Sequence, residues 1–120
     1  MTIMKDIDWV DKKTLAEYLD VSVRSVERFQ QLGMPHQKNS KKPFKVGISI
    51  HWYIGYTEAK PYGLKQNDGL TLTLFGYAIA DLNVSQLQNK GTEIANLTGH
   101  SHFDIGRAVG TLKQGNLVRS

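Results

Sequence analysis

Three side chains between residues 22 and 33 have the types and spacing that recognise base pairs. Arg24, Arg28 and Gln31 lie at positions i, i+4 and i+7, so on a helix they share one face. Guanidinium and amide groups form bidentate hydrogen bonds with base edges in the major groove of duplex DNA. Ser22 and Ser25 add hydroxyl groups beside them. The pattern predicts a helix face that reads double-stranded DNA.

A lysine-rich segment follows that face. Residues 36–46 also contain Asn39, Ser40 and Pro43, which favour a hairpin or loop over a helix. Its four lysines are Lys38, Lys41, Lys42 and Lys45. Ammonium groups bind backbone phosphates, which gives affinity and salt dependence without sequence information. Residues 21–57 carry six basic residues and one acidic residue, whereas the whole chain of 120 residues has a net charge of +4. The positive charge is therefore concentrated in this part of the chain.

Other groupings give less support for chemistry. His100, His102 and Asp104 are possible metal ligands, but they fall at a predicted turn and helix start, where such residues act as caps or phosphate contacts. We expect no metal, no cofactor and no enzymatic activity, because no Ser-His-Asp spacing, phosphate-binding glycine loop or acidic cluster stands out. The candidate DNA contacts are Ser22, Arg24, Ser25, Arg28, Gln31, Lys38, Lys41, Lys42, Lys45, His102 and Arg107.

Two helices are predicted to position the first set of contacts. Asp11 is a candidate N-cap of a helix with a buried stripe, and Ser22 is the N-cap of the next. Gly33 and Pro35 then end the second helix. The predicted inward residues are Leu15, Ala16 and Leu19 in the first helix and Val23, Val26 and Phe29 in the second. Residues 48–56 are predicted to form a short helix.

The second half repeats the helix–break–helix pattern. Residues 58–69 are rich in turn formers and predict a linker between residues 1–57 and residues 70–120. Thr71 is a candidate N-cap with a staple between Leu70 and Phe75, although the alternation of residues 70–74 also fits a strand. A short helix is expected at residues 92–97. Ser101 and Asp104 form a capping box for a further helix that ends at Gly115, followed by a strand at residues 117–118.

Several residues are candidates for packing against another surface. Gly106 and Gly110 lie four apart on the last predicted helix and would form a flat strip beside Phe103. This helix could pack on the first half or on a second protomer, or it could read DNA. The candidate interaction residues are Trp52, Tyr53, Phe103, Gly106 and Gly110.

These elements predict a mainly α protein with a small β wing, a winged helix-turn-helix, with two in tandem. The chain has no cysteine, which excludes a disulfide framework and thiolate chemistry. No apolar run approaches the ~20 residues of a membrane span, and no secretory leader opens the sequence. We expect a protein of the bacterial host cytoplasm that binds no membrane.

Residues 9–57 resemble the winged helix-turn-helix of lambdoid phage terminase small subunits. The resemblance rests on residues 12–19, residues 22–26, Gln30, Gly33-Met34-Pro35 and Trp52-Tyr53. It implies a protein that marks viral DNA for packaging, works with a large terminase subunit and forms a homodimer through this domain. Excisionases and phage regulators share the layout.

The second half is similar to the winged helix of bacterial regulators and replication proteins. The similarity is carried by residues 93–95, Thr98-Gly99, residues 107–109, Leu112 and residues 115–118. Two such units in tandem resemble plasmid-type replication initiators. Because the sequence stops at Arg119-Ser120, where a wing hairpin is expected, it suggests a fragment or a unit without its wing.

The leading hypothesis is a sequence-specific duplex-DNA-binding protein of a phage or mobile genetic element. It would mark a packaging site or a replication origin for a larger machine, either the large terminase subunit or the replication machinery. The alternatives are the N-terminal origin-binding part of a replication initiator, a transcriptional or excision regulator, and a protein-interaction adaptor.

Overall fold

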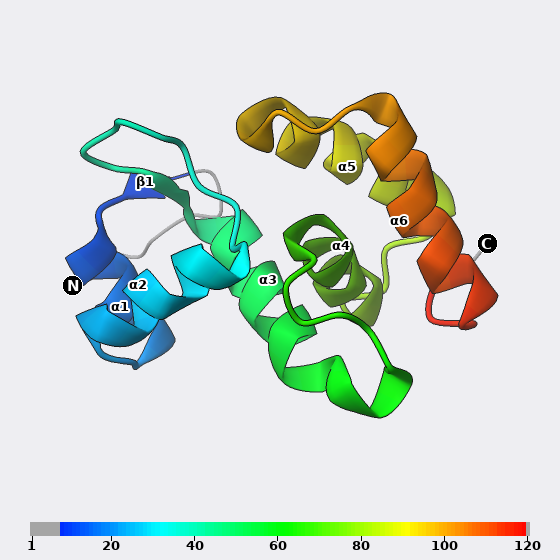
Figure 1. The fold of residues 1–120 in the computed structure, drawn as a ribbon, viewed down its shortest axis with the longest axis horizontal. Helices are drawn as coiled ribbons and strands as arrows, with labels where there is room; N and C mark the ends of the chain where they lie inside the picture. The colour runs from blue at the N-terminus through cyan, green and yellow to red at the C-terminus, as the bar shows by residue number, and fades with distance from the viewer. Residues whose placement is uncertain (1–7, 120) are drawn as a thin grey trace.

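A computed structural model describes residues 8–119 and is mainly α-helical, as the sequence predicts. The described residues form six α-helices, a single-turn 3₁₀ helix and a two-stranded antiparallel sheet. In chain order they are β1 (Trp9–Val10), α1 (Lys12–Leu19), α2 (Val23–Leu32), β2 (Phe44–Lys45), α3 (Val46–Glu58), η1 (Lys60–Tyr62), α4 (Gly69–Ile79), α5 (Val84–Thr98) and α6 (His102–Gln114). Helices α1 and α2 lie at one end of the molecule and α6 lies at the other (Figure 1).

Local hydrogen bonds define the first two helices and confirm the predicted caps. The Thr14 N–H donates to the Asp11 carboxylate (2.8 Å), and the Ser25 N–H donates to the Ser22 hydroxyl (3.1 Å). Gly33 ends α2 in the left-handed region at φ 113°, which few side chains tolerate. Three residues, numbers 20–22, therefore separate α1 from α2.

The core of this end lies between α1, α2 and α3. Leu15 and Val26 are fully buried, and the Phe29 ring lies 5.1 Å from the ring of Trp52 on α3. The prediction that Val23 faces the core is wrong, because Val23 is 41% exposed. It is the first residue of α2, next to the turn, so the buried face begins only at Val26.

The small sheet closes the other side of this core. β1 pairs with β2, with Trp9 opposite Lys45 and Val10 opposite Phe44. Between α2 and β2 the chain forms a loop, closed by a hydrogen bond from the Gln37 N–H to the Pro43 carbonyl (2.8 Å). The lysine-rich segment is thus a loop that leads into a two-residue strand, one of the two forms predicted.

Antiparallel helices α3 and α4 join the two halves of the molecule. An added Cβ at Gly55 would lie 1.8 Å from the Leu72 carbonyl oxygen, and one at Gly76 would lie 1.8 Å from that of His51. The two backbones therefore touch, because glycine has no side chain to keep them apart.

The hydrophobic interior continues across the predicted linker. Residues 58–69 connect α3 to α4 through η1 and a loop, and Ala59 is fully buried. Ile48 of α3 packs in the core formed with α4, α5 and α6, whereas Leu72 of α4 packs in the core formed with α1 and α2. The two halves consequently share core residues.

The second half differs from the prediction in its helix starts. Helix α4 begins at Gly69, with Asp68 rather than Thr71 as N-cap; the Thr71 N–H (3.1 Å) and hydroxyl (2.8 Å) both donate to Asp68. The alternative of a strand at residues 70–74 is wrong. All residues from 70 to 77 are buried, so the apolar pattern reflects burial on every side of a helix.

Helices α5 and α6 complete the fold. α5 begins at Val84, eight residues earlier than predicted, because Asn83 and Gln86 form a capping box. The predicted capping box of Ser101 and Asp104 is confirmed at the start of α6. Residues 117–118 form no strand; Arg119 alone makes a parallel bridge with Asn83. Within the described residues, no helix is long and apolar enough to cross a bilayer.

Candidate nucleic-acid interface

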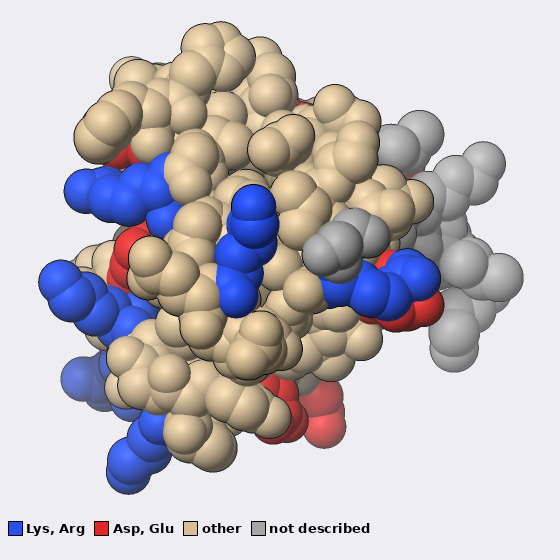
Figure 2. Space-filling model, turned by 90° about the vertical axis from the view of Figure 1, so that its right-hand side faces the viewer, with Lys and Arg blue, Asp and Glu red and all other residues tan. Residues whose placement is uncertain are grey.

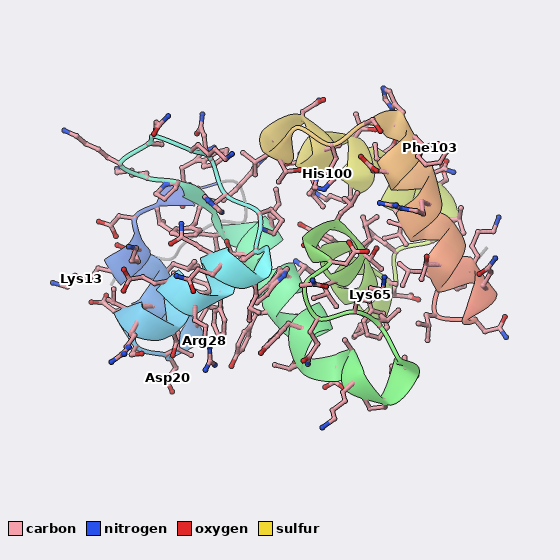
Figure 3. All side chains as sticks on the ribbon, in the orientation of Figure 1. Lys13, Asp20, Arg28, Lys65, His100 and Phe103 are labelled. Carbon is pink, nitrogen blue, oxygen red and sulfur yellow. The ribbon has the colours of Figure 1, made fainter. Side chains whose placement is uncertain are left out.

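The outer face of α2 presents the predicted base-reading side chains. Arg24, Arg28 and Gln31 are exposed, while Val26 and Phe29 hold the opposite face of α2 in the core. A depression along the helix is lined by Ser22, Arg24, Ser25, Glu27, Arg28 and Gln31. In Figure 3, Arg28 lies on the outside of α2. The structure thus brings the five candidates of this segment together.

Glu27 lies in the same depression and is absent from the sequence-based candidates. Its carboxylate pairs with the Lys12 ammonium group of α1 (3.2 Å), and both side chains are partly exposed. The pair joins α1 to α2 and partly neutralises Glu27 beside the two arginines. A carboxylate there can also accept a hydrogen bond from the amino group of cytosine. Its position next to Arg28 was the signal that could have identified it.

A groove beside α2 collects lysines from two separate segments. It runs between the start of α1 and the loop of residues 36–43, and we call it the lysine groove. Its lining residues are Asp11, Lys12, Lys13, Gln30, His36, Gln37, Lys38, Asn39, Ser40, Lys41 and Pro43. Lys42 is exposed on the same loop. Sequence reasoning missed Lys12 and Lys13, because they precede the basic segment and are surrounded by acidic residues.

The acidic residue of the lysine groove is held in its charged form. Hydrogen bonds from Thr14, together with the nearby charges of Lys42 and Lys13, lower the pKa of Asp11. Asp11 therefore caps α1 as a carboxylate, and the lysines provide the positive charge around it.

Lys45 lies apart from the other lysines of its segment. It is half-buried and forms an ion pair with Glu93 of α5, which also pairs with Lys90 (3.2 Å). Burial raises the pKa of Glu93, but hydrogen bonds from Lys45 and Lys90 outweigh it and leave the pKa below its ordinary value. The structure thus places Lys45 in a contact between β2 and α5.

The candidates of the second half lie on α6, far from the outer face of α2 (Figure 1). His102 is exposed at the first position of α6, and Arg107 pairs with Asp104 (3.2 Å). Hydrogen bonds from Ser101 lower the pKa of Asp104, and the charge of Arg107 adds to this effect. The structure does not bring His102 and Arg107 together with Arg24 and Arg28.

The interaction candidates divide into exposed and buried residues. Phe103 is 78% exposed, and a Cβ added at Gly106 or Gly110 would meet no atom within 4 Å. Trp52 is fully buried against Phe29 and Tyr56, and Tyr53 is half-buried beside Phe29. Uncharged residues cover most of the end of the molecule seen in Figure 2. Only the α6 residues of this set are therefore open to a partner.

The fold and site define a mainly α-helical protein with a two-stranded sheet and a basic surface beside one exposed helix. Across residues 8–119, no group of three His, Cys, Asp or Glu side chains is placed to hold a metal ion. Comparisons with protein families, curated proteins and solved structures found no match.

Proposed function

We propose that this protein binds double-stranded DNA through α2 and the neighbouring lysine groove. The observation that carries the proposal is their adjacency: the exposed arginines of α2 and the lysines of two chain segments border the same helix. The proposed module is a winged helix-turn-helix, with α1 and α2 as the helix pair and the loop of residues 36–43 as the wing.

The side chains of this surface suit both the base edges and the backbone phosphates of a DNA duplex. A major groove about 12 Å wide admits one α-helix, and α2 is held at its inner face by Val26 and Phe29. Arg24 and Arg28 then face guanine edges, and Gln31 suits adenine. The lysine groove supplies ammonium groups to the phosphates, which position the protein and give salt-dependent affinity.

The proposed biological role is to mark a DNA site of a phage or mobile element for a larger machine. Packaging and replication initiation are both retained, because the two halves resemble proteins of these different roles. A homodimer would read repeated half-sites about one helical turn apart. Regulation of transcription or excision would use the same interface.

One observation favours an adaptor as a second candidate function. Phe103 stands exposed beside two open glycines on α6, at the far end of the molecule from α2. Such a face suits a protein partner better than the DNA backbone.

The test is selection of bound duplexes from a random library, followed by fluorescence anisotropy on the selected duplex and a shuffled one across a salt series. The proposal expects tighter binding of the selected duplex, with affinity for both falling as salt rises. A folded protein that binds neither duplex at low salt would contradict DNA binding and leave the adaptor as the better candidate.

A further inference from the structure

A second groove lies on the other side of the lysine-rich loop. It is bounded by the end of α2 and the loop on one side and by the end of α5 on the other, and we call it the histidine groove. Its lining residues are Gly33, Met34, Pro35, His36, Lys38, Asn96, Leu97, Thr98, Gly99 and His100. His36 and Lys38 line both this groove and the lysine groove, so the two adjoin along the loop. In Figure 1 the end of α5 faces this loop, and Figure 3 shows His100 in the connection to α6.

The hydrogen bonds of the two histidines determine which ring nitrogen holds a proton. His36 Nδ1 lies 2.9 Å from the Met34 carbonyl oxygen, which can only accept, so Nδ1 must be the donor. The single hydroxyl proton of Thr98 is donated to the Ile94 carbonyl (2.9 Å). Thr98 can therefore only accept from His100 Nδ1, with which it is also in contact.

Because Nδ1 is the donor, the protonation state of each ring determines whether the other nitrogen, Nε2, accepts or donates a hydrogen bond. With Nδ1 as the donor of a neutral imidazole, Nε2 carries a lone pair and repels an anion. The imidazolium form places a proton on Nε2 and can donate it to a phosphate oxygen. Anion binding by the two imidazole rings, as distinct from binding by Lys38, therefore requires proton uptake.

The surrounding charges favour an anion in this groove. Lys38 contributes an ammonium group, and the lining residues include no Asp or Glu. The acidic side chains of the adjoining helices α5 and α6 are engaged by other groups: Asp104 on α6 by Ser101 and Arg107, and Glu93 on α5 by Lys45 and Lys90. Asp11, which lines the lysine groove together with His36, accepts a hydrogen bond from the Thr14 N–H. Asp104 also interacts electrostatically with His100.

We propose that the histidine groove binds backbone phosphates of duplex DNA outside the segment contacted by α2, through Lys38 and the protonated rings of His36 and His100. The inference rests on the proposed DNA-binding function and extends it. The DNA would pass from the lysine groove over the loop to the turn between α5 and α6. The second half would thus contribute to affinity at low pH without reading bases.

The experiment compares two duplexes at two pH values by fluorescence anisotropy. One duplex spans only the selected site, and the other extends it by about one helical turn on each side. For the unmodified protein, the longer duplex should bind roughly tenfold more tightly than the short one at about pH 6, a gain of about 1.4 kcal/mol. The gain should be much smaller at about pH 8, where imidazole side chains are neutral.

Two variants and a control isolate the groove. His100→Gln, at a residue that lines the histidine groove but not the lysine groove, should lose most of the length-dependent gain at low pH and retain binding of the short duplex. Lys38→Gln should lessen the gain at both pH values. Lys113→Gln, on the exposed last turn of α6, should change neither the length-dependent gain nor the binding of the short duplex. Circular dichroism melts would confirm that each variant is folded.

The results separate this inference from the proposed function. If the short duplex binds but extending it gives no gain, or gives a gain that is independent of pH or unchanged in His100→Gln, the histidine groove does not bind DNA and the proposed function stands. If the folded protein binds neither duplex, both fail.

Discussion

Gly55 on α3 lies directly against the carbonyl oxygen of Leu72 on α4, where a Cβ atom would come within 1.8 Å of that oxygen. Such a contact cannot be relieved by rotating a side chain, because both neighbouring atoms belong to helix backbones. The position of α4 against α3, and with it the joining of the two halves, therefore depends on the absence of a side chain at Gly55.

Gly55→Ala should destabilise the fold. Inserting an extra carbon into a packed core costs roughly 1–3 kcal/mol, and here the cost should lie at the upper end because the neighbouring atoms are backbone. It should therefore outweigh the ~1 kcal/mol that alanine gains over glycine within a helix. Urea denaturation would measure the loss. Gly110→Ala is the matched control, since a Cβ there meets no atom within 4 Å and should raise stability. Equal changes in the two variants would contradict the close packing of α3 and α4.

Arg28→Ala should weaken binding to the selected duplex by about 1–3 kcal/mol and relax the preference at one base pair. The reason is the loss of a bidentate contact to one base edge. Repeating the selection with the variant would locate the affected position. A uniform loss on every sequence, with the base preference unchanged, would instead place Arg28 on a phosphate.

Lys41→Gln/Lys42→Gln should weaken selected and shuffled duplexes alike. Each lost phosphate contact reduces the slope of log affinity against log salt by about 0.9. Anisotropy titrations at several salt concentrations give that slope, with Lys113→Gln, which removes one exposed positive charge on α6, as the control. An unchanged slope would show that the loop does not contact the backbone.

Glu93→Gln should make stability less dependent on pH in the acid range. The pKa of Glu93 is lowered in the folded protein from an ordinary 4.5, so its ion pairs contribute stability above about pH 4.5. That stability is lost as the pH falls through the lowered pKa. Urea unfolding at about pH 6 and about pH 3 should therefore show a larger loss for the unmodified protein than for the variant. Glu58→Gln, at the exposed end of α3, should behave like the unmodified protein.

Several errors of the sequence interpretation have a common physical cause. Residues 70–74 alternate like a strand, yet they form a helix because neighbouring elements bury all of its faces. Val23 matches the helical apolar period but lies beyond the buried surface of α2. Periodicity reports which residues could be buried, whereas the packing partners determine which of them are.

The local elements of this protein follow from its amino-acid sequence. Asp11, Ser22 and Ser101 cap helices through hydrogen bonds that span three residues, and Gly33 ends α2 through its own backbone conformation. The spacing of Arg24, Arg28 and Gln31 also follows from the helix alone. These features were predictable because every partner lies within a few residues.

Which distant residues come into contact depends on the packing of the helices. Lys45 belongs to the basic segment in the sequence, but its ammonium group pairs with Glu93, 48 positions further along the chain. Lys12 and Lys13 joined the loop lysines, and His36 came to share a groove with His100. These contacts depend on how α3 and α4 pack. No local sequence pattern indicates which of the distant residues that packing brings together. The helix proposed to read bases was therefore predictable from the sequence, while the surface around it was formed by the fold.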